Sequence, residues 1–269
     1  MDQPLIFLDV ETAAPTGAPH LIEVGAVRVV AGEAQDHFER LVCPEVPVAP
    51  EATEVHGLVV DDLREAGGPA DVLGELSEWI GGAWIAAHAA RFDAMALGFE
   101  YARCGIDPPD VAVLDTLPLA KRCLPEAPDH KLDTLVEHLE LDVGPRHRAL
   151  PDAVATWQVA DACIQTLGGW AAVGAADLLD RCGLPLRIAD SGPRAPRRQR
   201  ARVQALERAA REGAEITLVY GEQGEEPSRL PVRPKLVYQL NDRGYLEGEC
   251  SRSGSIKTYR IDRMQKILS

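Results

Sequence analysis

The sequence predicts an α/β fold with a mixed sheet, followed by a small β-rich domain that a helix precedes. Three observations support this prediction. Short apolar runs near the N-terminus are separated by turn residues, as in successive strands, and later runs alternate with segments of helical apolar spacing. In the last quarter of the 269-residue chain, short apolar runs return between turn signals.

The first three strands are expected at Leu5–Val10, Ile22–Val30 and Phe38–Val42. Gly32 and Glu33 form a plausible turn between the last two strands, so an antiparallel meander is predicted. Strands and helices then alternate, which indicates a mixed sheet. Strands are expected at Trp84–Ala87 and Val111–Leu114, and helices at Asp71–Ile80, Asp93–Arg103, Leu117–Cys123, Lys131–Leu139 and Ala149–Leu167.

The charge of the chain changes sign near its last third. The formal net charge is −14, but residues 1–193 hold 12 basic and 32 acidic residues, whereas residues 194–269 hold 16 and 10. The change coincides with a stretch of Pro, Gly and Ser that is typical of a linker. The sequence therefore divides into residues 1–185, a linker at 186–196, and residues 197–269.

The basic part begins with a helix expected at Arg197–Glu212, and residues 194–211 include seven arginines. An arginine-rich helix can follow a phosphate backbone, and the alternative is a solvated surface without a partner. Four short strands are expected after it, which gives a small, strongly bent β-domain: Glu215–Tyr220, Lys235–Leu240, Tyr245–Cys250 and Lys257–Ile261.

Composition excludes several classes of protein. No run approaches the roughly 18 apolar residues of a transmembrane helix, so no membrane association is expected. The N-terminus lacks the basic start of a secretory signal. The six cysteines are widely scattered, which disfavours a zinc site or a disulfide framework and favours free thiols in a cytoplasmic protein.

Asp9 and Glu11 lie at the end of the first apolar strand, with one residue between them. Side chains two apart on a strand point to the same face, so these carboxylates repel each other. A divalent cation removes that cost, and oxygen ligands suit Mg²⁺ or Mn²⁺ better than zinc. Alone, this pair is a weak indication of a metal site.

Two further segments pair a histidine with an aspartate five residues later. His88 and Asp93 follow a predicted strand, and Asp93 would lie in the first turn of a helix. His147 precedes a helix that carries Asp152 in its first turn. A loop histidine beside a metal site can deprotonate a water molecule. The alternatives are a helix cap at Asp93 and a surface histidine with a dipole-complementing aspartate.

Together these residues resemble the DEDDh 3′→5′ exonucleases, the family that includes the proofreading subunit of bacterial DNA polymerase III, RNase T and oligoribonuclease. The matching motifs are Asp9-x-Glu11-Thr12, His88-x₄-Asp93 and His147-x₄-Asp152. Residues 4–168 are covered in the family's order. Further matches are Ile22–Val27, Val55-His56-Gly57, Asp115-Thr116 and His130-Lys131-Leu132.

The resemblance implies an RNase H-like fold with a mixed five-stranded sheet. It implies two divalent cations held by four carboxylates, those of Asp9, Glu11, Asp93 and Asp152, with His147 as the general base. The substrate would be nucleic acid with a free 3′ end, with single-stranded DNA favoured and RNA left open.

Thr12, His88 and Phe92 are expected to contact that substrate, although core packing is an alternative role for Phe92. The chain departs from the family at Ala13-Ala14-Pro15 and at Ala89, where many members have Asn. These departures leave the metal ligands intact and affect the expected substrate contacts.

The last segment, about residues 213–268, resembles a WYL-type domain, a small Sm-like β-barrel, although its Gly244-Tyr245-Leu246 lacks the family's Trp. Such domains often bind single-stranded nucleic acid or nucleotide-like ligands. By position, the pocket would be lined by Tyr220, Arg233, Tyr245, Arg260 and Arg263. A β-core with a buried Tyr245 and solvated arginines is the alternative.

The sequence therefore predicts a metal-dependent exonuclease with a C-terminal binding module. An alternative is a slow or inactive nuclease-like regulatory protein that senses a ligand through the WYL-like domain. A polymerase-associated proofreading subunit is less favoured, because no short clamp-binding motif is evident.

Overall fold

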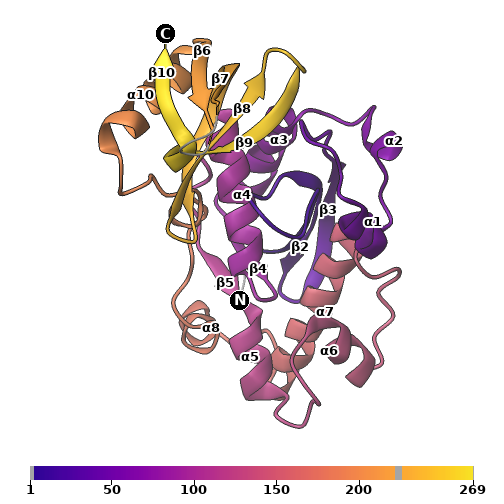
Figure 1. Ribbon diagram of the computed structural model, residues 1–269. Coiled ribbons are helices and arrows are strands. Elements are labelled where there is room, and N and C mark those ends of the chain that lie inside the picture. The colour runs from indigo at the N-terminus through magenta and orange to yellow at the C-terminus, as the bar shows by residue number, and fades with distance from the viewer. Residues whose placement is uncertain (1–2, 222–225, 269) are drawn as a thin grey trace. The chain divides into compact units, whose positions relative to one another are not determined.

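The computed structural model describes residues 3–221 and 226–268. Contacts divide the chain into two compact units, Met1–Gly192 and Pro193–Ser269 (Figure 1). Among the described residues, no helix combines the length and the apolar character that crossing a membrane requires.

The first unit is built on a five-stranded mixed sheet in the order β3-β2-β1-β4-β5. The first three strands pair antiparallel, whereas β4 and β5 continue from β1 in parallel, which confirms the predicted meander and mixed sheet. The strands are β1 (Leu5–Thr12), β2 (Leu21–Val30), β3 (Glu33–Leu41), β4 (Trp84–Ala87) and β5 (Val113–Asp115).

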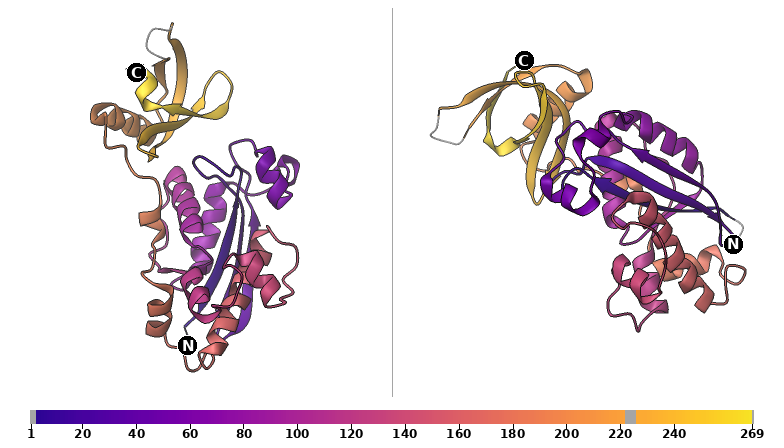
Figure 2. Two further views of the ribbon diagram at one scale, coloured as in Figure 1. Left: turned by 60° about the horizontal axis from the view of Figure 1, so that its bottom comes forward. Right: turned by 90° about the vertical axis from the view of Figure 1, so that its right-hand side faces the viewer.

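Helices cover both faces of this sheet (Figure 2). Ile6 and Leu8 of β1 pack in one apolar cluster with α3 (Pro69–Ile80) and α4 (Arg91–Cys104). Leu5 and Phe7 point to the other face because side chains alternate along a strand. That second cluster includes residues of α5 (Thr116–Cys123), α6 (Leu132–His138), α7 (Ala149–Thr166) and α8 (Ala175–Cys182).

Several short helices were not predicted, although α5 and α6, which are no longer than α8, were predicted from their apolar spacing. They are α1 (Pro50–His56), α2 (Val60–Leu63), α8 and α9 (Ile188–Ser191). The last of these lies within the predicted linker 186–196. Leu186 exchanges two backbone hydrogen bonds with Val113, and Ile188 is fully buried, so the first half of that segment is part of the first unit's fold.

The second unit consists of α10 (Arg200–Glu212) and a five-stranded antiparallel sheet in the order β10-β6-β7-β8-β9. The expectation of a closed Sm-like barrel is not confirmed, because the described strands leave β9 and β10 as the two edges of an open sheet. The short helix η1 (Ile261–Arg263) redirects the chain so that β10 pairs with β6. The strands are β6 (Ile216–Tyr220), β7 (Ser228–Leu240), β8 (Arg243–Cys250), β9 (Ser255–Arg260) and β10 (Met264–Leu268).

Candidate active site

Three carboxylates from β1 and α7 converge at one end of the first sheet. Asp9 and Glu11 are half-buried on β1, on the face to which Leu5 and Phe7 also point. That face is covered by α7, whose first turn carries the buried Asp152. One carboxylate oxygen from each of the three residues lies within 4.8 Å of the others.

Gly25 allows this convergence. It pairs with Asp9 across the β1–β2 ladder. A Cβ atom on Gly25 would lie 2.1 Å from the backbone nitrogen of Leu150, at the start of α7. Only glycine therefore lets α7 approach β2 closely enough to place Asp152 beside β1. Sequence reasoning included Gly25 in the resemblance but missed this role.

A buried ion pair fixes the start of α7. Glu23 on β2 is fully buried and accepts a 2.6 Å hydrogen bond from Nη2 of Arg148. The same carboxylate accepts the backbone N–H of Ala149 at 3.0 Å, which satisfies one of the free amides at the helix N-terminus. An acidic residue near the start of a mostly apolar strand was a signal of this role, and sequence reasoning missed it.

Asp93 supplies the fourth carboxylate from the first turn of α4. Its side chain is 4 % exposed and is hydrogen-bonded to the backbone of Val10, on β1. The N-cap position belongs to Ala90, so Asp93 is not the capping residue of this helix. Its negative charge, together with burial, raises the pKa of Asp9.

The protein environment disfavours ionisation of all four carboxyl groups. Burial, followed by the charge of Asp93, raises the pKa of Asp9 well above its ordinary value. Burial raises the pKa of Glu11 to about 7 and that of Asp93 to about 8. The pKa of Asp152 is also raised by burial, against the opposing charge of Arg146.

The loop before α7 brings Arg146 and His147 to the cluster. The guanidinium of Arg146 forms ion pairs with Asp152 and with the half-exposed Asp133. The backbone N–H of His147 donates to Oδ2 of Asp152 at 3.2 Å. His147 is exposed and has a left-handed backbone, with φ of 58°. Sequence reasoning identified His147 but missed Arg146.

The donor set fits divalent cations. Every candidate ligand atom is a carboxylate oxygen, which suits Mg²⁺ or Mn²⁺. The carboxyl groups are buried or half-buried and repel one another, so cations would supply the missing counter-charge. Asp93 is not one of the three residues whose ligand atoms lie within 4.8 Å of one another. It is a fourth acid beside that group.

The three residues predicted to contact substrate have different environments. Phe92 is 43 % exposed, so it is not part of the core. Thr12 is buried, and its hydroxyl donates to the carbonyl of Ala14 at 3.2 Å. Both ring nitrogens of His88 are engaged, by the hydroxyl of Thr116 at 3.0 Å and the carbonyl of His130 at 2.8 Å. The substrate roles of these residues stay predictions.

Two open hollows border the loops of this site. One, of about 610 Å³, is lined by His88 and Ala89 together with Leu117, Lys121 and residues 129–132. The other, of about 630 Å³, includes Arg146 and Arg148 and residues 54–58.

In the second unit, the predicted pocket residues mostly contact one another or their neighbours. Tyr245 stacks on Tyr238, with ring centroids 5.5 Å apart. The hydroxyl of Tyr220 accepts the backbone N–H of Arg260 at 3.2 Å. The guanidinium of Arg260 is paired with Asp262. Arg233 is exposed, and Arg263 is half-buried.

Comparison with known proteins identifies both parts of the chain. Residues 6–160, more than half of its length, match the family model described as Exonuclease, and residues 201–268 match the WYL domain. The chain belongs to the exonuclease family and carries a WYL domain after the exonuclease part.

Curated relatives include DNA polymerase III PolC-type from Oceanobacillus iheyensis, which is 34% identical over 152 residues, and from Bacillus subtilis, which is 32% identical over 157. These matches cover 56% and 58% of this chain but only 11% of each relative. The chain thus corresponds to about a tenth of those polymerases.

Solved structures share the fold at low sequence identity. Exonuclease X in complex with 5′ overhanging duplex DNA has a TM-score of 0.52 and 24% identity, covering 66% of this chain and 99% of that one. The nuclease domain of 3′hExo, a DEDDh family member bound to rAMP, has a TM-score of 0.55 and 17% identity, covering 62% and 94%. These similarities confirm the predicted exonuclease fold.

Proposed function

We propose that this protein is a metal-dependent 3′→5′ exonuclease that hydrolyses phosphodiester bonds at the 3′ end of nucleic acid. The observation that carries the proposal is the convergence of Asp9, Glu11 and Asp152 within 4.8 Å, in a chain of the exonuclease family. Single-stranded DNA is the proposed substrate. DNA rather than RNA is supported by the curated relatives, which are DNA polymerases, and by exonuclease X, which was solved with 5′ overhanging duplex DNA. RNA is the alternative, since another structural neighbour recognises a histone mRNA stem-loop.

Two divalent cations, Mg²⁺ or Mn²⁺, would be held by Asp9, Glu11, Asp93 and Asp152. When bound, such cations activate a water molecule and stabilise the departing 3′ oxygen. Asp9 is the proposed shared ligand, because the charges of the other three acids all act on it. Gly25 and the pair formed by Glu23 and Arg148 position the helix that carries Asp152.

His147 is the proposed general base. It lies at the solvent-exposed edge of the cluster, where its backbone already contacts Asp152. From this place the imidazole can accept the proton of the attacking water and release it to solvent. Arg146 shields the negative charge of Asp152 by direct contact.

The second unit is proposed to bind nucleic acid or a nucleotide-like ligand. On α10, Val203, Leu206 and Ala209 are buried against the sheet, which leaves Arg200, Arg208 and Arg211 exposed. Exposed arginines on one helix can contact successive phosphates.

The decisive experiment uses 5′-labelled single- and double-stranded DNA and RNA, with Mg²⁺, Mn²⁺ or a chelator. We expect a ladder that shortens from the 3′ end with metal only. Asp9→Ala should lose about 10³-fold or more in rate, while Asp107→Ala, which removes an exposed acid of the same unit, should be unchanged. If the unmodified protein degrades no substrate with either metal, the alternative of an inactive, ligand-sensing protein replaces this proposal.

A further inference from the structure

The loop between α6 and α7 brings an arginine into contact with the carboxylate cluster. Arg146 lies in this loop, three residues before the first residue of α7. Its Nη1 atom forms an ion pair with Oδ1 of Asp152, in the first turn of α7. Its Nε atom donates to Oδ1 of Asp133 at 2.8 Å, in the first turn of α6. One guanidinium group therefore joins the starts of two helices.

This loop engages both carboxylate oxygens of Asp152. Oδ1 contacts Arg146, and Oδ2 accepts the backbone N–H of His147 at 3.2 Å. The carboxylate of Asp152 is also one of the three whose oxygens lie within 4.8 Å of one another. A cation held by Asp152 would therefore have to share an oxygen that a donor of the protein already uses.

The positive charge of Arg146 acts on more than its contact partner. Burial raises the pKa values of Asp152, Glu11 and Asp9, and the charge of Arg146 lowers each of them. For Asp152, this charge is the largest of the opposing effects. Arg146 thus supplies part of the counter-charge that the buried carboxylates need. A divalent cation would supply the same counter-charge, and two positive charges at adjacent positions repel each other.

Asp133 gives the guanidinium of Arg146 a second partner. The side chain of Asp133 is 50 % exposed, whereas that of Asp152 is 9 % exposed. If the contact with Asp152 opens, the hydrogen bond to Asp133 still holds the arginine beside α6. The arginine can therefore leave the cluster without losing both of its carboxylate partners.

We propose that Arg146 is an internal counter-ion that competes with divalent cations for Asp152, and that Asp133 retains the guanidinium when a cation takes its place. The proposal rests on the proposed function, because it treats Asp152 as a cation ligand. It goes beyond that function by assigning control of cation affinity to a residue that is not itself a ligand.

The test is calorimetric titration of the full-length protein with Mn²⁺ in the absence of nucleic acid. The titration is made at pH 8, where Glu11, with its pKa of about 7, is mostly ionised and protons compete less with the cation. Arg146→Gln should bind Mn²⁺ about tenfold or more tightly, because it frees Oδ1 of Asp152 and removes a competing positive charge. The same variant should unfold at a lower urea concentration with a chelator, because the carboxylates lose their counter-ion. A purely structural role would lower stability without raising the affinity for Mn²⁺.

Asp133→Asn should have the opposite effect on cation binding. It should weaken Mn²⁺ binding about threefold or more, because the displaced guanidinium loses its second partner. In the Arg146→Gln background the same substitution should have no further effect, because no guanidinium remains to be retained. The matched controls are Arg122→Gln and Asp180→Asn, which open an exposed ion pair elsewhere in the same unit and should leave Mn²⁺ affinity unchanged.

The proposal is overturned if Arg146→Gln binds Mn²⁺ no more tightly than the unmodified protein. It is also overturned if Asp133→Asn weakens binding equally in both backgrounds, or if neither protein binds Mn²⁺. Should circular dichroism show that Arg146→Gln does not fold, Asp133→Asn alone decides, because it must weaken Mn²⁺ binding where Asp180→Asn does not. Strand degradation by the unmodified protein tests the exonuclease separately. Degradation without a gain in affinity for Arg146→Gln would overturn the counter-ion alone, and a gain in affinity without degradation would overturn only the exonuclease.

Discussion

The two units present charge in opposite ways. In the first unit, four carboxylates are buried or half-buried next to one another, and burial is the largest cause of their raised pKa values. In the second unit, the arginines of α10 are mostly exposed. A buried cluster of like charges stores unfavourable energy, whereas solvated charges at a surface cost little.

This difference predicts different responses to substitution. Removing a carboxylate from the cluster should stabilise the metal-free fold while abolishing function. Removing an arginine from the second unit should weaken binding and leave stability almost unchanged. In the metal-free protein, the carboxylate cluster of the first unit therefore lowers the stability of the fold. The exposed arginines of the second unit do not.

The largest effect is expected at His147. His147→Ala should lower the exonuclease rate by about 10²–10⁴-fold, the usual contribution of a general base. Mn²⁺ binding, measured by calorimetry, should be retained because His147 is not a proposed ligand. Loss of Mn²⁺ binding in this variant would instead place the imidazole among the ligands. His138→Ala, which changes a histidine at the end of α6, is the control.

The next effect is a pH-dependent stability of the metal-free protein. Burial raises the pKa of Asp93 from 3.8 to about 8. Between these two pH values the native state therefore binds more protons than the unfolded state does. The stability contributed by Asp93 is therefore fully present below about pH 4 and is lost as pH rises toward about 8.

The free energy of unfolding, measured by urea titration with a chelator, should fall across this window by about 3 kcal/mol or more relative to Asp93→Asn. The control Asp71→Asn, at an exposed carboxylate, should show no such divergence. If the wild-type and Asp93→Asn curves stay parallel from pH 4 to 8, the unfavourable burial of Asp93 is refuted.

A steric change should follow at Gly25. Gly25→Ala places a Cβ against the start of α7 and should destabilise the protein by about 2–3 kcal/mol, with a loss of activity because Asp152 moves away from Asp9. Gly74→Ala is the matched control. No atom lies within 4 Å of a Cβ there, so this helical position should gain about 0.5–1 kcal/mol. Thermal unfolding and the strand assay together measure both effects, and a stable, active Gly25→Ala protein would exclude the close approach.

A smaller effect, on the salt dependence of strand binding, is expected when arginines of α10 are replaced. Replacing Arg200, Arg208 and Arg211 with Gln in the Asp9→Ala background should reduce the slope of log affinity against log salt by about 2 for a long single strand. Equal slopes for this variant and its parent would show that these arginines do not contact phosphates. Arg64→Gln, on the first unit, serves as the reference for a change of surface charge.

The smallest effect concerns Ala89, which has a left-handed backbone with φ of 57°. Asn adopts this conformation more readily than Ala, so Ala89→Asn should raise the free energy of unfolding by up to about 1 kcal/mol. Ala31→Asn, at φ of 52° in the β2–β3 turn, should gain a similar amount. A change in strand affinity for Ala89→Asn alone would show that this loop contacts substrate.

The sequence by itself predicted that the first sheet has five strands, with the bounds of β3 and β5 shifted, and it singled out the acidic residues Asp9, Glu11 and Asp152 that lie together in the structure. Residue alternation and apolar spacing are local properties, so Trp84–Ala87 was predicted with its observed bounds and the meander with its correct pairing. The sequence also separated the basic segment from the acidic one, because charge can be counted without a fold.

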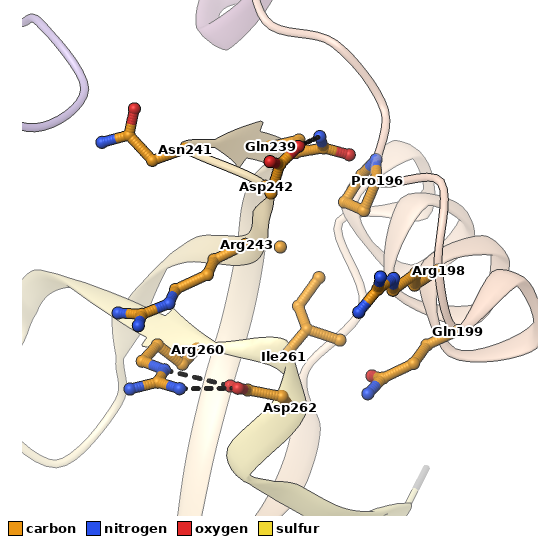
Figure 3. A pocket seen from close by; sticks show the side chains of 11 residues that line it. Pro196, Arg198, Gln199, Gln239, Asn241, Asp242, Arg243, Arg260, Ile261 and Asp262 are labelled. Carbon is orange, nitrogen blue, oxygen red and sulfur yellow. Dashed lines mark hydrogen bonds and ion pairs between the residues drawn. The ribbon is translucent and has the colours of Figure 1, made fainter.

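Only the tertiary structure decided how these parts meet. Gly25, Glu23 and Arg148 act by bringing β2 against α7, more than 120 residues away in sequence, so no local pattern shows their role. The expected barrel became an open sheet because strand closure depends on which edges find each other in space. A pocket of about 440 Å³ in the second unit likewise joins three separate segments, and of the five residues that the sequence predicted for a ligand site its lining includes only Arg260 (Figure 3).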